Sequence, residues 1–582
     1  MIGGMLMRLA PLLEFSLWGS DWGEYYGLVD GLVRTGAHQG TSVGWGRAYV
    51  DFTGLFDLSA AIVLLTGVGT PDTMTLVVPC VSAISCLLVA CIVLRLGGGP
   101  WGSLVAAGVL ALSFPVVYTN SHPVPGALGS VLLLAVLLVY IMGDAWRRDE
   151  EVDAPRPMVL YVLLILLLFT LVITHHLSLF FGIMILGLAY LVRSAMVVGP
   201  EPQRSFWGLW SLTAGLALAT VYWLLIADTF REEVMVDLAG YPGWAMMAMA
   251  WAGLVALVVL GRVLSARVER PPRLLFWGPS LLVPSVVVYF IAAIAVVLAV
   301  AFFGFPGTEI PLGATMVAYV LPTVIVFSLL VGSTDHVLRV NGGYVMVAWI
   351  AAVGLSFILA SLAHSRVLIP YRHVPYLVDA SAVLMGVGAV HLHRMLSRPE
   401  GRVQRPRVGR AVLATAATAM VVLLALTAYP PKEVMGNFQE GTTESELGAS
   451  LWVRGGLPWP GAELEDTSSG AVATDHRMSS MVFGIGEAMA TWDTAGPTLL
   501  GEPRPSLWKS LDDVDTPNGD RPVTVVVISE DLRTGAALSQ VEGPEPIDGV
   551  AWDKFFEPPF VKIYDGGDVW VLYVLRPLDS SG

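Results

Sequence analysis

The chain has 582 residues, of which 55% are hydrophobic and only 14% are charged, and its formal net charge at pH 7 is −14. Apolar runs of about 17 to 25 residues recur along it, which is more than the core of a soluble protein needs. This composition excludes an ordinary soluble enzyme, and the negative charge argues against a nucleic-acid partner. The sequence therefore predicts a polytopic α-helical membrane protein.

The distribution of charge divides the chain into two parts. Residues 1–428 contain no Lys, and their Arg residues nearly balance their Asp and Glu residues, whereas residues 429–582 carry almost the whole negative excess. We therefore expect a transmembrane domain over 1–428 and a soluble domain over 429–582. All three Cys residues lie in one apolar run at 80–91, with a spacing that suits helix packing better than disulfides or a metal site.

The apolar runs predict about thirteen spanning helices, several of them shorter than a full bilayer crossing. The first run contains Arg8 and Glu14, so a signal peptide is the alternative there, although no Ala-x-Ala-like cleavage site precedes Trp18. The runs lie at 1–17, 74–94, 101–118, 124–142, 158–173, 177–192, 206–226, 244–261, 281–303, 311–331, 343–362, 375–391 and 411–428.

The run at 55–69 resembles a further span, but counting it would invert every later loop and put the richest Arg clusters outside the cell. If it instead lies along the membrane surface or re-enters it, most Arg residues become cytoplasmic, including the cluster from Arg394 to Arg410. We therefore expect an external first loop over 18–73 with an interfacial helix at 55–69. Everything after residue 428 is then also external, in a multi-pass protein of the cell membrane.

The external tail contains strand-like apolar runs. One is VTVVVIS at 523–529, and the other, at 560–575, reads as a hairpin that turns at Gly566 and Gly567. A helix-like stretch lies at 443–454. Together these segments predict an extracytoplasmic domain of mixed α/β structure.

Acidic residues and histidines stand in the predicted external loops of a chain that is otherwise poor in charge. Asp21 and Glu24 lie in WGSDWGEYY directly after the first apolar run, and other loops hold His122 in YTNSHPVPG, His175 and His176 in THH, and Glu309 in GFPGTEIP. Taken singly, such residues are often loop residues that face water. Taken together, Asp21, His122 and Glu309 favour a site for Mg²⁺ or Mn²⁺, which would neutralise the phosphate of a leaving group.

A second external cluster is basic. Arg366, Arg372 and His373 lie in AHSRVLIPYRHVPYLVD, between the predicted eleventh and twelfth spans. A guanidinium group binds phosphate oxygens through paired hydrogen bonds, so this cluster predicts a site for the phosphate of a lipid-linked substrate. The alternative is that these Arg residues anchor the chain in lipid headgroups.

The external acidic motif, the interfacial helix, the number of spans and the external C-terminal domain together resemble the GT-C membrane glycosyltransferases. The likeness is greatest to the catalytic subunit of archaeal and bacterial oligosaccharyltransferases. It implies a GT-C-like fold and metal-assisted, inverting transfer of a sugar or glycan from a polyprenyl (dolichyl) phosphate or diphosphate. The acceptor would be a glycan, a cell-wall polymer or a protein at the cell surface, and we expect an archaeal source.

The resemblance also implies a metal site built from three external loops. In that family the first loop supplies a metal-binding Asp, which GSDWGEYY matches at Asp21. Asp21 is also the first candidate for the catalytic base, and Glu24 is the second. The family's second loop carries Asp-x-Asp or Asp-x-His, which NSH matches only through His122, since Asn120 replaces the acid. A later loop carries a Glu, for which GTEI offers Glu309.

For the donor phosphate, the family's Arg before the twelfth span matches Arg366 best and Arg372 second. The family's sequon-reading motif, Trp-Trp-Asp-Tyr-Gly, is missing, because the chain has GAVATDHRMSSMVFG at that place. We expect Asp475, His476 and Arg477 to bind the acceptor there, and the acceptor to differ from an Asn-x-Ser/Thr peptide. The alternative is that Asp475 only caps a helix.

Two other functions fit parts of the pattern. A transporter or flippase of a lipid-linked substrate would need ionisable residues at mid-membrane and repeated broken helices, whereas the deep spans are almost free of charge. A non-catalytic glycan-binding or scaffold subunit would account for Asn120 and for the missing Trp pair.

Overall fold

The computed structural model describes most of the chain. The described residues are 1–38, 44, 46–146, 157–196, 202–235, 242–267, 337, 342–363, 369–397, 406–432, 439–457, 470–501, 506–512, 514–517, 519–538 and 544–576. The predicted spans at 281–303 and 311–331 lie outside these ranges, and so do Glu309 and Arg366.

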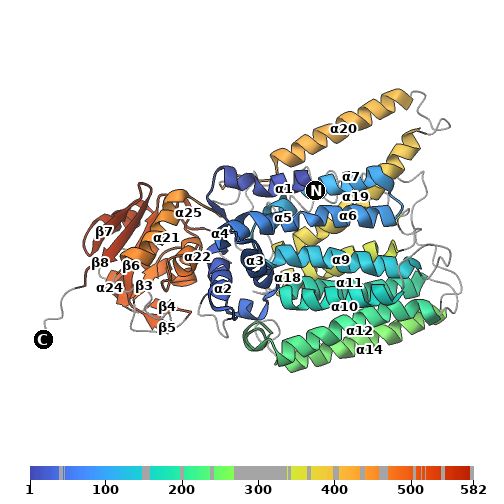
Figure 1. Ribbon diagram of the computed structural model, residues 1–582, viewed down its shortest axis with the longest axis horizontal. Coiled ribbons are helices and arrows are strands. Elements are labelled where there is room, and N and C mark those ends of the chain that lie inside the picture. The colour runs from blue at the N-terminus through green and yellow to red at the C-terminus, as the bar shows by residue number, and fades with distance from the viewer. Residues whose placement is uncertain are drawn as a thin grey trace.

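Long apolar helices form a bundle in which they run side by side (Figure 1). Seven described helices are long and apolar enough to cross a membrane, and the bent pair α7 and α8, which meet at 63°, would make an eighth. The fold class is thus confirmed as multi-span and helical, but the exact number of thirteen spans is not. The bundle helices are α6 (Ile84–Arg95), α7 (Gly99–Leu112), α8 (Phe114–Asn120), α9 (Pro125–Trp146), α10 (Pro157–Thr174), α11 (His176–Met196), α12 (Pro202–Leu225), α14 (Gly243–Arg267), α18 (Tyr344–Ala363), α19 (Val374–Ser397) and α20 (Pro406–Leu426).

The helices before α6 begin the bundle. The predicted first span is shorter than expected, since it consists of α1 (Ile2–Leu9) and the 3₁₀ helix η1 (Ala10–Leu13). The next span runs continuously from Thr70 to Arg95 through α4 (Thr70–Asp72), the π-helix η3 (Thr73–Val77), α5 (Val78–Ser82) and α6.

Small residues let bundle helices approach closely. A Cβ built on Gly102 of α7 would lie 2.5 Å from the backbone oxygen of Gly386 in α19, and one built on Gly386 would lie 2.4 Å from the backbone oxygen of Gly102. The two backbones are therefore in direct contact, as is common where helices pack without a hydrophobic driving force between them.

The C-terminal part contains a four-stranded sheet with the strand order β3-β6-β8-β7. Strand β3 (Ala471–Ala473) is parallel to β6 (Val523–Ser529), and β8 (Val569–Val574) is antiparallel to both β6 and β7 (Phe560–Asp565). The predicted strand at 523–529 and the predicted hairpin are thus confirmed. Gly567 has a φ of +93°, a conformation that favours glycine in this tight turn.

Both faces of this sheet are covered, which explains why β6 is apolar at successive positions. Val526 and Ile528 belong to one core, while Val525 and Val527 belong to the other. The surrounding elements are α21 (Glu444–Gly456), α22 (His476–Gly484), η7 (Trp492–Thr494), α23 (Gly496–Leu500), α24 (Ser506–Asp512), β4 (Val514–Thr516), β5 (Gly519–Arg521), α25 (Leu532–Gly535), α26 (Gly549–Asp553) and η8 (Lys554–Phe556).

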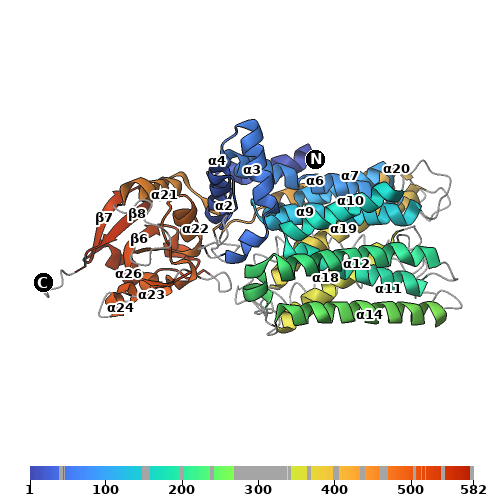
Figure 2. The same cartoon turned by 60° about the horizontal axis from the view of Figure 1, so that its bottom comes forward.

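The first loop lies between the C-terminal sheet and the helix bundle (Figures 1 and 2). It contains β1 (Leu17–Trp18), α2 (Trp22–Thr35), η2 (Arg47–Asp51) and α3 (Gly54–Thr66). Helix α3 occupies most of the segment that we expect to lie along the interface. Strand β1 pairs antiparallel with β2 (Gly441–Thr442), so the beginning of the chain is joined to the C-terminal part by backbone hydrogen bonds.

Helix α2 also packs directly on α22, and glycines make this possible. A Cβ on Gly23 would lie 2.2 Å from the backbone oxygen of Ser480, and one on Gly484 would lie 1.7 Å from the backbone oxygen of Gly23. Side chains at these positions would push the two helices apart. The first loop and the C-terminal part are therefore so close that their backbones touch, and larger residues at these two positions would not fit.

We expect Gly23→Ala to destabilise this junction, because the new Cβ would meet a backbone atom that cannot rotate away. The cost should be about 1–3 kcal/mol, measured as a lower unfolding temperature of the purified protein in detergent. Gly27→Ala is the matched control, since it changes the same helix and its Cβ would lie 3.4 Å from the Cα of Gly484, at the edge of ordinary contact. Equal unfolding temperatures for the two variants would contradict the described packing of α2 on α22.

Candidate active site

Asp21 lies at the turn between β1 and α2. Two backbone N–H groups before it are held by Glu440, because Gly19 donates to the Glu440 backbone oxygen (3.1 Å) and Ser20 donates to Glu440 Oε2 (2.7 Å). Gly19 has a φ of +124°, which lets the chain turn sharply there. Although Asp21 stands at the N-cap position of α2, its side chain makes no capping hydrogen bond and points instead to the C-terminal part.

The partner of Asp21 is His476, the first residue of α22. His476 Nε2 lies 3.2 Å from Asp21 Oδ1, and His476 Nδ1 lies 2.6 Å from Asp493 Oδ1. Burial alone would lower the pKa of this imidazole, but the hydrogen bonds and charges of the two carboxylates outweigh burial and raise the pKa to about 10. His476 is therefore an imidazolium at neutral pH and donates from both ring nitrogens.

Asp21 is a carboxylate at the same pH. Burial raises its pKa, but the hydrogen bond and the positive charge of His476, together with the charges of Arg372 and His122, lower it by more. The net pKa lies below the ordinary value for Asp. The side chain keeps 19% of its surface exposed, so it remains within reach of a bound molecule.

Arg372 and His122 reach this place from distant parts of the chain. Arg372 belongs to the 3₁₀ helix η6 (Pro370–His373), directly before α19, and His122 follows α8. The His122 ring packs 5.7 Å from the ring of Trp18 and 5.3 Å from that of Tyr118, measured between centroids. His122 is 8% exposed, and among the described residues its Nε2 has no hydrogen-bond partner. The structure thus brings Asp21, His122, Arg372 and His476 together.

Glu24 lies one turn after Asp21 on α2 and is buried. Its Oε1 accepts a hydrogen bond from the backbone N–H of Gly46 (2.8 Å), and its own backbone N–H donates to Ser480 Oγ (3.0 Å). Burial and the negative charge of Asp21 raise the pKa of Glu24 to about 7. Its contacts hold the segment around Gly46 against α2.

His373 is enclosed between helices. It is fully buried, with Nδ1 3.2 Å from the backbone oxygen of Ile369 and Nε2 2.8 Å from Ser356 Oγ. Both ring nitrogens are therefore used within the protein, and the ring packs on Phe181 at 5.0 Å. These contacts join α18 and α11 to the start of α19.

Two of the three predicted acceptor-binding residues hold the start of α22 in place. Asp475 Oδ1 accepts from the backbone N–H of Met478 (3.1 Å), so Asp475 is the N-cap of α22. Arg477 is buried and forms two hydrogen bonds with Glu446, one of them 2.7 Å long, and a third with the backbone oxygen of Gly441 (2.8 Å). Of the three, His476 is the one that faces Asp21.

Asp493 is a site residue that the sequence did not reveal. It lies in η7, 17 residues after His476, and its side chain is 28% exposed. Neither its neighbours nor its spacing from Asp21 and His476 forms a recognisable motif. Its role becomes visible only through its contact with the imidazole.

The residues that the structure describes do not make up a divalent-metal site. No group of three His, Cys, Asp or Glu side chains suited to a metal ion occurs among them. Asp21 and His122 could supply two ligands, but Asp21 Oδ1 is already bound to a protonated imidazole, and Glu309 lies outside the described ranges.

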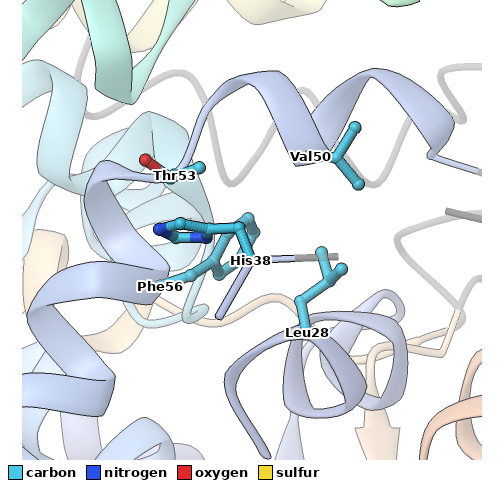
Figure 3. A pocket seen from close by; sticks show the side chains of 5 residues that line it. All are labelled: Leu28, His38, Val50, Thr53 and Phe56. Atoms are coloured by element: carbon cyan, nitrogen blue, oxygen red, sulfur yellow. The ribbon is translucent and has the colours of Figure 1, made fainter. Parts of the chain in front are cut away.

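A small pocket lies nearby between α2, η2 and α3 (Figure 3). It is lined by Leu28, His38, Val50, Thr53 and Phe56. His38 Nε2 pairs with Asp57 Oδ1 at 2.9 Å beside this pocket. None of the predicted site residues that the structure describes lines it, and its lining belongs to the first loop.

No protein-family model and no curated protein match the sequence. Solved structures do match. The crystal structure of the Archaeoglobus fulgidus oligosaccharyltransferase tethered with an acceptor peptide containing the NVT sequon has a TM-score of 0.58 and 12% identity, over 89% of this chain and 66% of that chain.

The same archaeal enzyme, AglB, was also solved in two other complexes that match. Its complex with an inhibitory peptide and a dolichol-phosphate gives a TM-score of 0.54 and 13% identity, over 89% of this chain and 66% of that chain. Its complex with Zn and sulfate gives a TM-score of 0.54 and 12% identity, over 89% of this chain and 65% of that chain. This chain therefore has the fold of a GT-C membrane glycosyltransferase, as its sequence predicts, and its matched region spans just under two thirds of the archaeal protein.

We expect the stability of the protein to fall as pH rises, because His476 binds its proton more tightly in the folded state. Its pKa is about 10 when folded and 6.5 ordinarily, so its contribution is fully present below about pH 6.5 and is lost as pH approaches 10. Unfolding temperatures measured in detergent from pH 6.5 to 10 should fall more steeply for the wild type than for His476→Gln. Parallel curves would show that His476 is not charged in the folded protein.

Proposed function

We propose that the protein is a polyprenyl-phosphate-dependent glycosyltransferase with Asp21 as its catalytic carboxylate. The observation that carries this proposal is the convergence of Asp21, His122, Arg372 and His476 in a GT-C fold. The related archaeal oligosaccharyltransferase has been crystallised with an acceptor peptide and solved with a dolichol-phosphate, which supports a lipid-phosphate donor and a separate acceptor for this chain.

The residues support direct displacement at the sugar carbon, with inversion. The Asp21 carboxylate accepts a hydrogen bond from the acceptor's hydroxyl and orients its oxygen towards the sugar. Because its pKa is low, Asp21 is a weak base, and it takes the proton as the carbon–oxygen bond to the phosphate breaks. Arg372 binds the phosphate oxygens and stabilises the negative charge that develops on them.

The predicted Mg²⁺ or Mn²⁺ remains a hypothesis that depends on Glu309. Asp21 and His122 would contribute a carboxylate oxygen and the imidazole Nε2, which are suitable donors for such an ion. A bound ion would add positive charge beside the leaving phosphate.

For the acceptor, we propose a hydroxyl group of a glycan or of a lipid-linked chain. His476 is the one residue of the predicted acceptor set that faces Asp21, while Asp475 and Arg477 hold α22 in place. The sequence there lacks the Trp pair with which oligosaccharyltransferases read a sequon. A polar surface without that pair suits hydroxyl groups better than the methyl group of a peptide's Thr.

The reaction is proposed to occur outside the cell. Helix α11 begins beside η2, where the rings of His176 and Phe52 are 5.0 Å apart, and its 21 residues carry the chain about 30 Å away. Arg193, in the last turn of α11, therefore lies at the far end of the bundle from the candidate active site. Helix α19 runs in the same direction, from Arg372 towards the cluster at 394–410. Arg-rich ends of membrane helices face the cytoplasm.

We expect a cysteine at Asp520, which is exposed in β5, to react with a membrane-impermeant maleimide in intact cells. A cysteine at Ser397, the last residue of α19, should react only after the cells are permeabilised. Both replacements are made in a background in which the three native Cys residues are replaced by Ala. The opposite labelling pattern would overturn the proposed topology.

We expect Asp21→Asn to lower the rate of glycosyl transfer by about 10²–10⁴-fold, because the amide cannot take the acceptor's proton. The assay uses purified protein, a radiolabelled polyprenyl-phosphate sugar and glycan acceptors, with and without Mn²⁺. Asp30→Asn is the control, since Asp30 also lies on α2 and pairs with Arg34 at the surface. If the wild type transfers no sugar to any acceptor, the proposal fails and a non-catalytic glycan-binding subunit becomes the better reading.

A further inference from the structure

We propose that Asp493 is a positioning residue that fixes Asp21 for catalysis through the imidazole of His476. The proposal rests on the function proposed above and adds a residue to it. Asp493 does not itself approach the reacting atoms, since the His476 ring lies between the two carboxylates. Its effect on the reaction is therefore indirect.

The geometry of the bridge carries the argument. The two nitrogens of an imidazole lie on different sides of a rigid ring, so the bond from Asp493 Oδ1 to Nδ1 (2.6 Å) determines where Nε2 points. Nε2 then lies 3.2 Å from Asp21 Oδ1. Without Asp493, the ring would lose one of the hydrogen bonds that set its orientation, and the donor that Nε2 presents to Asp21 would be less precisely directed.

The backbone of His476 is held independently of Asp493. Its N–H donates to the backbone oxygen of Ala537 (2.8 Å). Helix α22 is further fixed by the N-cap Asp475 and by the buried pair of Arg477 with Glu446. Removing the Asp493 carboxylate therefore leaves α22 in place and changes mainly the orientation and charge of the His476 ring.

The residue before Asp493 has a strained backbone conformation, and the side chain of Asp493 that follows it contacts His476. Trp492 is a buried non-glycine residue with a φ of +42°, in the left-handed region that costs such residues about 1–3 kcal/mol. The conformation is held because the Trp492 N–H donates to Ser479 Oγ (3.0 Å). Strain of this kind persists only where surrounding contacts hold the residue in place. Here it accompanies the contact of the Asp493 side chain with the His476 imidazole.

A purely structural role makes a different prediction from a positioning role. If His476 only docks the C-terminal part on the first loop, losing Asp493 lowers stability but leaves the kcat of the folded protein unchanged. If Asp493 positions Asp21, kcat falls while the KM for the lipid-linked donor stays the same, because Arg372 still binds the phosphate.

The first experiment measures transfer kinetics on folded, purified variants. Asp493→Ala should lower kcat by about 10²-fold, the effect of misplacing a reacting group, with the donor KM changed less than about twofold. Asp493→Asn retains an oxygen that accepts from Nδ1 and should recover part of the loss. Asp565→Ala is the control, since it removes an exposed carboxylate that pairs with Lys562 in the same part of the chain. A wild-type kcat for Asp493→Ala would overturn the proposal.

The second experiment tests the bridge without any enzymatic assay. Unfolding temperatures are measured for Asp21→Ala, Asp493→Ala and the double variant. Because both carboxylates act on one imidazolium, the shift of the double variant should differ from the sum of the single shifts. Additive shifts would show that the carboxylates are not coupled and would overturn the proposal, whereas a wild type without transfer activity but with coupled shifts would overturn only the proposed function.

Discussion

The contact between Asp21 and His476 is the interaction on which the candidate active site depends. The two residues are 455 positions apart in the chain, so nothing local brings them together. Their distance is set by the backbone contact between α2 and α22 at Gly23 and Gly484 and by the short sheet of β1 and β2. Any separation of these elements would remove the imidazolium from Asp21 and expose both charges to water.

The negative charge of Asp21 is offset by positive charges on two sides. Two carboxylates share one imidazolium, and the positive charge of Arg372 acts on Asp21 from the side of the helix bundle. Asp21 therefore remains ionised in a largely buried position, where an isolated carboxylate would tend to take up a proton. The positive charge of Arg372 therefore adds to that of His476 in keeping Asp21 ionised.

The likeness to the archaeal oligosaccharyltransferase is one of fold, at 12–13% identity. The sequence lacks the Trp-Trp-Asp-Tyr-Gly motif of that family, and the start of α22 holds a helix cap, an imidazolium and a buried Arg–Glu pair. Arg477 pairs with Glu446 inside the protein, so its charge supports the helix rather than a ligand. The same fold can carry sites of different chemistry.

Hydrophobic runs determined the helical bundle from sequence alone, because a backbone in lipid must satisfy its own hydrogen bonds and a helix does so locally. Helices α9, α11 and α19 therefore lie close to their predicted ranges, and the strand at 523–529 and the Gly566–Gly567 hairpin likewise follow from short-range pattern and turn geometry. Asp21 was also identifiable, since an acid among aromatic residues next to a membrane span is unusual. The sequence also offered Asp475 as a helix cap, because an Asp before a helix is a local pattern. Tertiary structure alone decided that Asp493 lies at the candidate site, that Arg477 pairs inside the protein, and that His373 is enclosed. Each of these three placements depends on a side-chain partner or on a packing environment that no local sequence pattern encodes.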